Sequence, residues 1–526
     1  MINVINASEY VCDKIITALW LTPKFKLTLV KYHQMKHSIN AASIYWHDYE
    51  TFGTNAKTDR PVQFAGIRTD LDLNIIGDPL VIYCKPAMDF LPDPRACLVT
   101  GITPQHALEH GLLEADFIKK ILAEFSKPNT CVSGYNSIRF DDEFTRYTLY
   151  RNLYDAYARE WQNGNSRWDI IDLVRVCYAL RPDGINWPMD DNGQVSFRLE
   201  KLTAENNIQH SDAHDALSDV KATIAMAKLI KDKQPKLYDY YFQHRNKRLI
   251  ANLLDIEHKK PVLHTSSMFP VEYACTALVA PLASHPTNTN GIISYDLRYN
   301  PTDLLALPVD DIIQRLYTRT QDLPEGMNRI ALKTIHLNKC PVVVPAKLDD
   351  FTTNRLQINK QQAHEHLQIL REASGLKEKL IRIFEHNPFD EETDADYQLY
   401  GGNFFSNTDK KQMEKIHRTK PSELQNLHLY FEDERLDSLF FRFRARNYFD
   451  TLGDEEKQDW LRFIDKKLAD LNYPMNRENF KSIIETIRSE NSLDEKKLQI
   501  VNQLTAYEKM ISTRLSDQLE NVETLG

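Results

Sequence analysis

The sequence predicts an α/β domain, followed by a small β-rich module and then by an all-helical region. Three observations support this prediction. From residue 43, short β-branched and aromatic runs alternate with helical patterns. Around residues 234–235 the pattern changes to closely spaced β-like runs separated by turn residues. From residue 360 onward the spacing of apolar residues is that of helices.

Composition limits the class of protein. A chain of 526 residues is too long for one hydrophobic core, so about two to four domains are expected. Its seven cysteines lack paired spacing, which argues against a disulfide framework or a zinc site and favours a reducing, cytoplasmic location. No apolar run approaches the roughly 20 residues of a membrane span. With a formal charge of −9, binding to nucleic acid requires a local basic patch.

The α/β domain is expected at residues 43–234, after an extension of residues 1–42 that shows no convincing period. Its first strand, at 44–53, is rich in β-branched and aromatic residues and runs into a loop at Gly53. The strands expected next are at 61–69, at 73–84 with a turn at Gly77-Asp78, and at 131–134. One helix is expected to begin at Pro104, with Thr103 as its N-cap, and another at 136–150.

The end of this domain is expected to be helical. A proline- and glycine-punctuated excursion at 181–196 leads to a helix from Arg198. The last helix is expected to run from Asp212 to about residue 231, with Asp212 as a cap and Asp215 in the first turn. Its predicted buried stripe consists of Leu217, Val220, Ile224 and Ala227.

The rest of the chain is expected to form two further domains. Residues 235–386 predict a β-barrel-like domain, of which 236–358 are expected to contain one helix near 310–317, and residues 392–526 predict a helical domain. An acidic break at 390–396 predicts an exposed linker between them. The β-like runs are at 262–265, 276–280, 292–297, 330–335 and 342–344, and the late helices are expected at 409–418, 433–446, 454–471, 475–490 and 493–520.

Two carboxylates on the first strand are the first candidate functional residues. Asp48 and Glu50 are two residues apart, so alternation along a strand places them on the same face. Neighbouring carboxylates on an otherwise apolar strand are costly to bury unless a cation lies between them. An Asp-x-Glu pair by itself is nevertheless common and is often an ordinary surface pair.

Three later residues complete a catalytic pattern. Asp141 comes early in a helix that follows a strand, and His214 and Asp219 are placed on the first turns of an amphipathic helix. Four carboxylates and one imidazole suit phosphodiester hydrolysis by two metal ions, because oxygen ligands favour Mg²⁺ or Mn²⁺ over zinc. A neutral histidine, with an ordinary pKa of about 6.5, is suited to accept the proton of the attacking water.

The order and spacing of these residues resemble the DEDD exonucleases of the histidine subtype. Further segments resemble more closely the bacterial exonuclease I family, and the likeness extends from about residue 43 to the final helices. They are HDYETFG (47–53), GYN (134–136), RFDDE (139–143), ALRP (179–182), GINWP (184–188), AHDA (213–216), HRNK (244–247), NKCP (338–341) and RARN (444–447).

This resemblance implies a fold and an activity. The fold is a ribonuclease-H-like exonuclease domain, a small Src-homology-like β-barrel and an all-α C-terminal domain, which together form a C-shaped clamp. The activity is 3′→5′ degradation of single-stranded DNA to 5′-mononucleotides in DNA repair and recombination, by a monomer with two Mg²⁺ ions, for which Mn²⁺ could substitute. By position, the metal ligands are Asp48, Glu50, Asp141 and Asp219, and the general base is His214.

The resemblance also places contacts to substrate and partner. Single-strand binding requires cations for phosphates and aromatic faces for bases. The matching residues, besides Glu50, are Arg146, Tyr157, Trp161, Arg175 and Arg198, of which Arg198 is favoured because it lies between the excursion and the catalytic helix. The acidic, Phe-ending tail of single-stranded DNA-binding protein is expected to contact Arg181, Tyr240, Lys260 and Arg371.

Several neighbouring residues admit plainer interpretations. Asp142 competes with Asp141 as a ligand, although the Phe-Asp pattern favours Asp141, and His47 and His210 are expected to be bystanders. The aromatic and arginine residues of 440–446 are as consistent with helix packing and ion pairs as with DNA binding.

Two other functions are considered. An RNA-trimming relative such as an oligoribonuclease would not need the two extra domains. A non-catalytic single-strand-binding scaffold would not need all five chemical positions to be filled.

Overall fold

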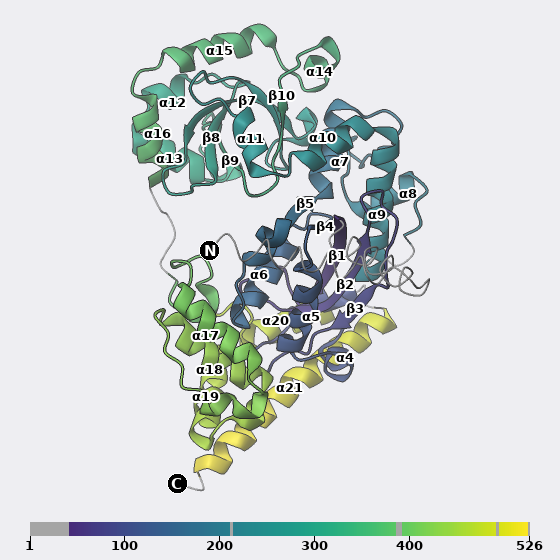
Figure 1. Ribbon diagram of the computed structural model, residues 1–526, viewed down its shortest axis with the longest axis vertical. Helices are drawn as coiled ribbons and strands as arrows, with labels where there is room; N and C mark the ends of the chain where they lie inside the picture. The colour runs from purple at the N-terminus through teal and green to yellow at the C-terminus, as the bar shows by residue number, and fades with distance from the viewer. Residues whose placement is uncertain (1–41, 211–213, 386–391, 491–493, 524–526) are drawn as a thin grey trace, which may run out of the picture.

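The computed structural model describes residues 42–210, 214–385, 392–490 and 494–523 (Figure 1). The predicted extension and the predicted N-cap Asp212 lie outside the described residues, apart from residue 42. Three regions follow one another along the chain: an α/β domain, a β-rich domain and a helical domain. The predicted fold class is therefore confirmed.

The α/β domain is built on a five-stranded mixed sheet of order β3-β2-β1-β4-β5. The central strand β1 pairs antiparallel with β2 and parallel with β4, so both of its edges are hydrogen-bonded, and nearly all of its residues are buried. The strands are β1 (Ser43–Thr51), β2 (Pro61–Thr69), β3 (Leu80–Tyr83), β4 (Thr130–Gly134) and β5 (Ser166–Asp169). The helices are α3 (Pro94–Thr100), α4 (Pro104–His110), α5 (Glu114–Phe125), α6 (Asp141–Arg151), α7 (Ile170–Leu180), α8 (Leu199–Glu205) and α9 (Ala216–Lys233).

Three predicted boundaries in this domain are wrong. The strand expected at 73–84 is shortened to β3, because Asp70 accepts from the backbone of Asp72 and of Asn74 and folds the preceding residues into a turn. The helix expected from residue 136 begins at Asp141, because Asn136 adopts a left-handed conformation. The helix expected from Asp212 begins at Ala216. The predicted cap Thr103 does accept from the backbone of His106.

The second domain contains an antiparallel sheet of order β10-β6-β7-β8-β9. Its strands are β6 (Val262–Thr265), β7 (Thr276–Ser284), β8 (Gly291–Asp296), β9 (Leu332–His336) and β10 (Val342–Pro345). The expectation of one helix between residues 236 and 358 is wrong, although the predicted helix is present as α13 (Val309–Tyr317). The others are α10 (Pro235–Gln243), α11 (Lys247–Leu253), α12 (Thr302–Ala306), α14 (Asp350–Arg355), α15 (Lys360–Glu372) and α16 (Leu376–Glu385).

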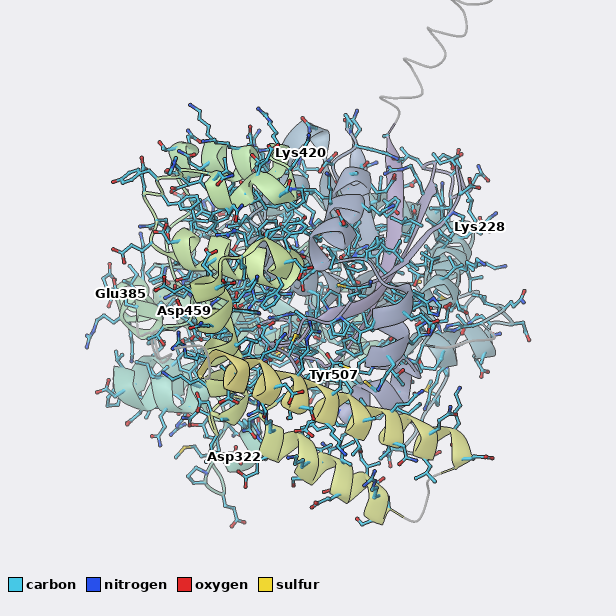
Figure 2. The ribbon with its side chains drawn as sticks, turned by 90° about the horizontal axis from the view of Figure 1, so that it is seen from below. Lys228, Asp322, Glu385, Lys420, Asp459 and Tyr507 are labelled. Atoms are coloured by element: carbon cyan, nitrogen blue, oxygen red, sulfur yellow. The ribbon has the colours of Figure 1, made fainter. Side chains whose placement is uncertain are left out.

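The third domain consists of α17 (Asn407–Arg418), α18 (Arg435–Asn447), α19 (Asp454–Ala469), α20 (Arg477–Ser489) and α21 (Glu495–Glu523). Helices α20 and α21 cross one end of the molecule side by side, and Tyr507 of α21 is buried in the core (Figure 2). The prediction of an exposed linker at 390–396 is wrong for Asp396, which is 1% exposed and paired with Arg446.

Hydrophobic clusters join the α/β domain to both neighbours. One cluster runs from Trp46 and Trp168 of the α/β sheet to Leu278 of the β-rich domain. Another joins Phe64 to Leu436 of α18. Both flanking domains are therefore anchored on the central sheet (Figure 1). Among the described helices, none combines the length and apolarity needed to cross a membrane.

Candidate active site

Two strand carboxylates form the base of the candidate site. Asp48 and Glu50 lie on the central strand β1, and the irregularity in its pairing with β2 falls after Glu50, so the alternation between the two is preserved. Glu50 is 8% exposed. The Glu50 carboxylate contributes to a raised pKa of Asp48, as expected for carboxylates on a shared face.

Asp141 is brought to β1 by the turn between β4 and α6. Buried Asp169 accepts hydrogen bonds from the backbone of Asn136 at 2.9 Å and of Ile138 at 3.0 Å, which holds this turn. At the start of α6, Asp141 accepts from the backbone N–H of Tyr49 at 3.0 Å. Tyr49 lies between Asp48 and Glu50, so this hydrogen bond ties the third carboxylate directly to the first two.

Asp219 and His214 come from the last helix of the domain and the residues before it. Asp219 lies in the first turn of α9, which packs against β1 and β2. His214 precedes the helix with φ of 70°, so the prediction that it lies on a helical turn is wrong. Candidate ligand atoms of Glu50, His214 and Asp219 nevertheless all lie within 4.8 Å of one another.

The carboxylates strongly disfavour one another's charged form. Burial and the charges of Asp219 and Asp141 raise the pKa of Glu50 to about 8. Burial and the charge of Asp141 raise the pKa of Asp48 well above its ordinary value. Burial also raises the pKa of Asp141 and of Asp219. Such crowding is relieved when a cation binds among the carboxylates.

The donor set fits a divalent metal. Within the part of the chain that the structure describes, no lysine or arginine forms an ion pair with Asp48, Glu50 or Asp141. Carboxylate oxygens are the ligands that Mg²⁺ and Mn²⁺ prefer. Asp48, Glu50, Asp141 and Asp219 are therefore residues whose oxygen atoms could hold a metal.

The structure separates Asp141 from its neighbour. Asp142 contacts Arg159 at 2.5 Å and Arg167 at 2.6 Å, and all three side chains are buried. These guanidinium groups hold the pKa of Asp142 well below its usual range, despite burial. Asp142 thus serves a buried ion-pair network, whereas Asp141 faces the acidic cluster.

The expectation that His210 is a bystander is wrong. Its Nε2 atom hydrogen-bonds Asp219 Oδ1, and the backbone of His214 bonds to the same carboxylate. His47, by contrast, is directed away from the acidic cluster. Its Nδ1 atom lies 3.1 Å from the carbonyl oxygen of Ser133, and its ring packs against Phe125.

The predicted strand contacts fall into two groups. Arg198, just before α8, is exposed, and Trp161 is 66% exposed. Arg146 and Arg175 are buried and form ion pairs. Arg146 pairs with Glu143 and Glu160, and Arg175 pairs with Asp172. Tyr157 is half-buried, and the Arg146 guanidinium lies over its ring. Arg198 and Trp161 are therefore the members of this set that are free to meet a strand.

Two side chains from the other domains contact residues near the site, and neither was predicted from the sequence. Tyr400 of the helical domain accepts from Arg146 at 3.1 Å and donates to Glu143 at 2.5 Å. Lys333 of β9 lies near Arg139 of the α/β domain, and burial together with this guanidinium lowers the pKa of Lys333 to about 8. Nothing in the local sequence signals either contact, because each joins segments far apart in the chain.

The predicted partner residues separate into two pairs. Arg181 and Tyr240 line one cavity of about 520 Å³ between the α/β and β-rich domains. Its other lining residues include Leu237, Pro345 and Lys347, which give it an apolar floor with cationic groups nearby. Arg371 instead donates to the carbonyl oxygen of His258, two residues from the exposed Lys260.

Comparison with known proteins covers all three domains. The family models that match are described as "Exonuclease" at residues 45–227, "Exonuclease I SH3-like domain" at 245–386 and "Exonuclease I C-terminal domain" at 393–511. Exodeoxyribonuclease I of Haemophilus influenzae is 48% identical over 469 residues, which are 88% of this chain and 98% of that protein. The Escherichia coli protein of the same name is 50% identical over 418 residues, 79% of this chain and 88% of its own.

Solved structures agree over the same span. Exonuclease I from Methylocaldum szegediense is 47% identical with a TM-score of 0.86, and the match covers 90% of this chain and all of that one. E. coli exonuclease I in complex with a dA16 oligonucleotide is 46% identical with a TM-score of 0.86, covering 89% of this chain and all of its own. A zinc-bound complex of the E. coli enzyme with single-stranded DNA is similarly close, with a TM-score of 0.86. The chain belongs to the exodeoxyribonuclease I family.

Proposed function

We propose that this protein is a metal-dependent 3′→5′ exonuclease that degrades single-stranded DNA to 5′-mononucleotides in DNA repair and recombination. The observation that carries the proposal is the convergence of Asp48, Glu50, Asp141 and Asp219 with His214, in a chain whose relatives are exodeoxyribonucleases. The E. coli relative has been solved with single-stranded DNA, which supports the same substrate class here.

The four carboxylates are proposed to hold two Mg²⁺ ions, with Mn²⁺ as a substitute. When bound, such ions supply a nucleophilic hydroxide and neutralise the departing 3′-oxygen. The protein prepares the site by holding the carboxylates in place: Asp48 and Glu50 on a buried strand, and Asp141 on the Tyr49 N–H. Their raised pKa values support the proposal, because a cation among them would offset the crowding of negative charge.

His214 is proposed as the general base. Its imidazole lies beside Glu50 and Asp219, and its side chain is exposed to the solvent that supplies the attacking water. Its left-handed backbone is uncommon for a residue with a β-carbon, and such conformations occur often at functional sites. Glu50 is proposed to contact the substrate as well as a metal ion.

The strand is proposed to pass the exposed Arg198 and Trp161, which offer a cation for phosphate and a face for a base. Arg146, Arg175 and Tyr157 remain proposed contacts, although the two arginines would have to share their hydrogen atoms with existing carboxylate partners. Lys333 and Arg139 add positive charge between the α/β and β-rich domains.

A peptide partner is proposed at the cavity lined by Arg181 and Tyr240. An apolar floor beside cationic groups suits an acidic peptide that ends in an aromatic side chain, such as the tail of single-stranded DNA-binding protein. Lys260 and Arg371 are proposed to contact the acidic residues that precede this aromatic end.

Fluorescence anisotropy with the labelled tail peptide tests this proposal. Both Arg181→Ala and Tyr240→Ala should weaken binding of the peptide. The control Arg418→Ala, which changes an exposed ion pair elsewhere, should leave binding unchanged.

The activity is tested with a 5′-labelled single strand and its RNA counterpart, each with Mg²⁺ and with chelator. Shortening of the DNA from its 3′ end, release of 5′-mononucleotides, loss of activity in chelator and weak cleavage of RNA are expected. Equal or faster trimming of RNA would contradict the proposed substrate. A mobility shift of the DNA without cleavage would contradict catalysis.

A further inference from the structure

His210 is held at both of its ring nitrogens. Its side chain is 4% exposed, and Nε2 hydrogen-bonds Oδ1 of Asp219. On the other side of the ring, Nδ1 lies 3.1 Å from Oγ1 of Thr203, a residue of α8 that is fully buried. An imidazole bonded at both nitrogens has one orientation, so the contact with Asp219 is fixed by the fold.

The chemistry of the three groups determines how the ring is bonded. An ionised carboxylate can only accept, so the hydrogen between His210 and Asp219 is carried by Nε2. The other ring nitrogen, Nδ1, lies within hydrogen-bond distance of Thr203 Oγ1. Thr203 also lies 2.9 Å from the carbonyl oxygen of Leu199, which fixes its side chain within α8. These contacts form a relay from Thr203 through His210 to Asp219.

This relay reaches Asp219 from outside its own helix. Asp219 lies in the first turn of α9 with its side chain 20% exposed, and it faces the carboxylates of β1. Thr203 lies one turn beyond Arg198, the exposed residue that precedes α8. A hydrogen bond from α8 through His210 thus limits the rotation of the carboxylate and ties it to the helix nearest the proposed strand contact.

We propose that His210 is a positioning residue that holds the Asp219 carboxylate in the orientation needed to bind a divalent cation, and that Thr203 fixes His210. The inference rests on the proposed function, because it takes Asp219 as a metal ligand. Groups that hold metal ligands typically contribute about 10- to 100-fold to metal affinity or activity. A loss in this range is expected when the hydrogen bond to Asp219 is removed.

The test is an EPR titration of Mn²⁺ binding to the full chain without DNA, with the melting temperature measured in chelator. His210→Ala should weaken Mn²⁺ binding by about 10- to 100-fold. His210→Gln, whose amide N–H can occupy the position of Nε2, should restore most of the affinity. Thr203→Val should cause a smaller loss, because His210 remains but can rotate. The matched control is His258→Gln, which changes another histidine–aspartate pair, with Asp255, at an exposed position.

Two results would overturn the proposal. One is Mn²⁺ affinity in His210→Ala within twofold of the wild type. The other is an equal loss in His210→Ala and His210→Gln with equal falls in melting temperature, which would make His210 a packing residue. A wild-type protein that binds Mn²⁺ but does not cleave DNA would contradict the proposed function, while the effect of His210 on Mn²⁺ binding would still be measured.

Discussion

The backbone N–H of Tyr49 donates to Oδ1 of Asp141 at 3.0 Å, and so joins the start of α6 to the strand that carries the other two carboxylates. The next residue, Asp142, points instead into a pair of buried guanidinium groups. Two adjacent aspartates on one helix turn thus have opposite environments. One is crowded by negative charge, and the other is surrounded by positive charge.

Substitution of these two aspartates should have opposite effects. Asp141→Asn removes a proposed metal ligand, so the rate should fall by at least about 10³-fold, while stability in chelator is kept or raised because a crowded charge is lost. Asp142→Asn leaves Arg159 and Arg167 without a charged partner and should lower the free energy of unfolding by about 3–5 kcal/mol. Nuclease assays and urea unfolding measure the two effects. A stable Asp141→Asn protein of normal activity would contradict the assignment.

Metal binding should stabilise the protein more at high pH. The pKa of Glu50 is raised from 4.5 to about 8, so the folded, metal-free state keeps a proton that the unfolded chain releases within this range. The contribution of this group to stability therefore falls as the pH rises from about 4.5 to 8. A bound cation removes the penalty, so Mg²⁺ should raise the melting temperature more at pH 8 than at pH 5. Equal shifts at both pH values would show that the crowding is unimportant.

A buried charge network holds the helical domain against the α/β domain. Asp89, which is fully buried, contacts Arg446 of α18 at 2.8 Å and Lys467 of α19 at 3.0 Å. Asp89→Asn should lower the free energy of unfolding by about 3–5 kcal/mol, because two buried cations lose a charged partner. The matched control is Asp459→Asn, labelled in Figure 2, whose pair with Arg462 is exposed and is worth about 0–1 kcal/mol. Similar losses in both variants would be inconsistent with this interpretation.

Exposed and buried arginines should differ in their effect on strand binding. Arg198→Ala should weaken binding to single-stranded DNA and reduce its salt dependence by about one phosphate contact. Trp161→Ala should cost about 1–3 kcal/mol of binding without changing the salt dependence. Arg146→Ala should first lower stability, because Glu143 and Glu160 lose their partner. Binding titrations at several salt concentrations distinguish these outcomes, and an unchanged salt slope in Arg198→Ala would count against a phosphate contact.

Local sequence patterns predicted the elements near the site well. The buried strand that carries Asp48 and Glu50, the strand before Asp141 and the five strands of the β-rich domain could all be found from apolar spacing and turns. Of the two interpretations left open for residues 440–446, the structure supports packing and ion pairs: Phe443 is buried in a cluster with Leu436, and Arg442 and Arg444 form ion pairs with Asp394 and Glu456.

The errors concern features that depend on tertiary structure. The acidic stretch before the helical domain suggested a solvated linker, but the charge of Asp396 is used by Arg446, which lies 50 residues later. The contact between His210 and Asp219 has no signal in the sequence, because the loop around His210 shows no periodic pattern and its ring also meets Thr203 of α8. The start of α6 was misplaced because the conformation of Asn136 is set by Asp169, a residue of another strand.

The most direct test of the central claim compares wild-type protein with Asp48→Asn on a 5′-labelled single strand with Mg²⁺. The control is Asp190→Asn, which changes a partly exposed turn carboxylate in the same domain. The account predicts that the wild type and the control shorten the strand from its 3′ end, whereas Asp48→Asn binds the strand with similar affinity but does not cleave it. Cleavage by Asp48→Asn at the wild-type rate would contradict the claim that this carboxylate cluster is the catalytic centre.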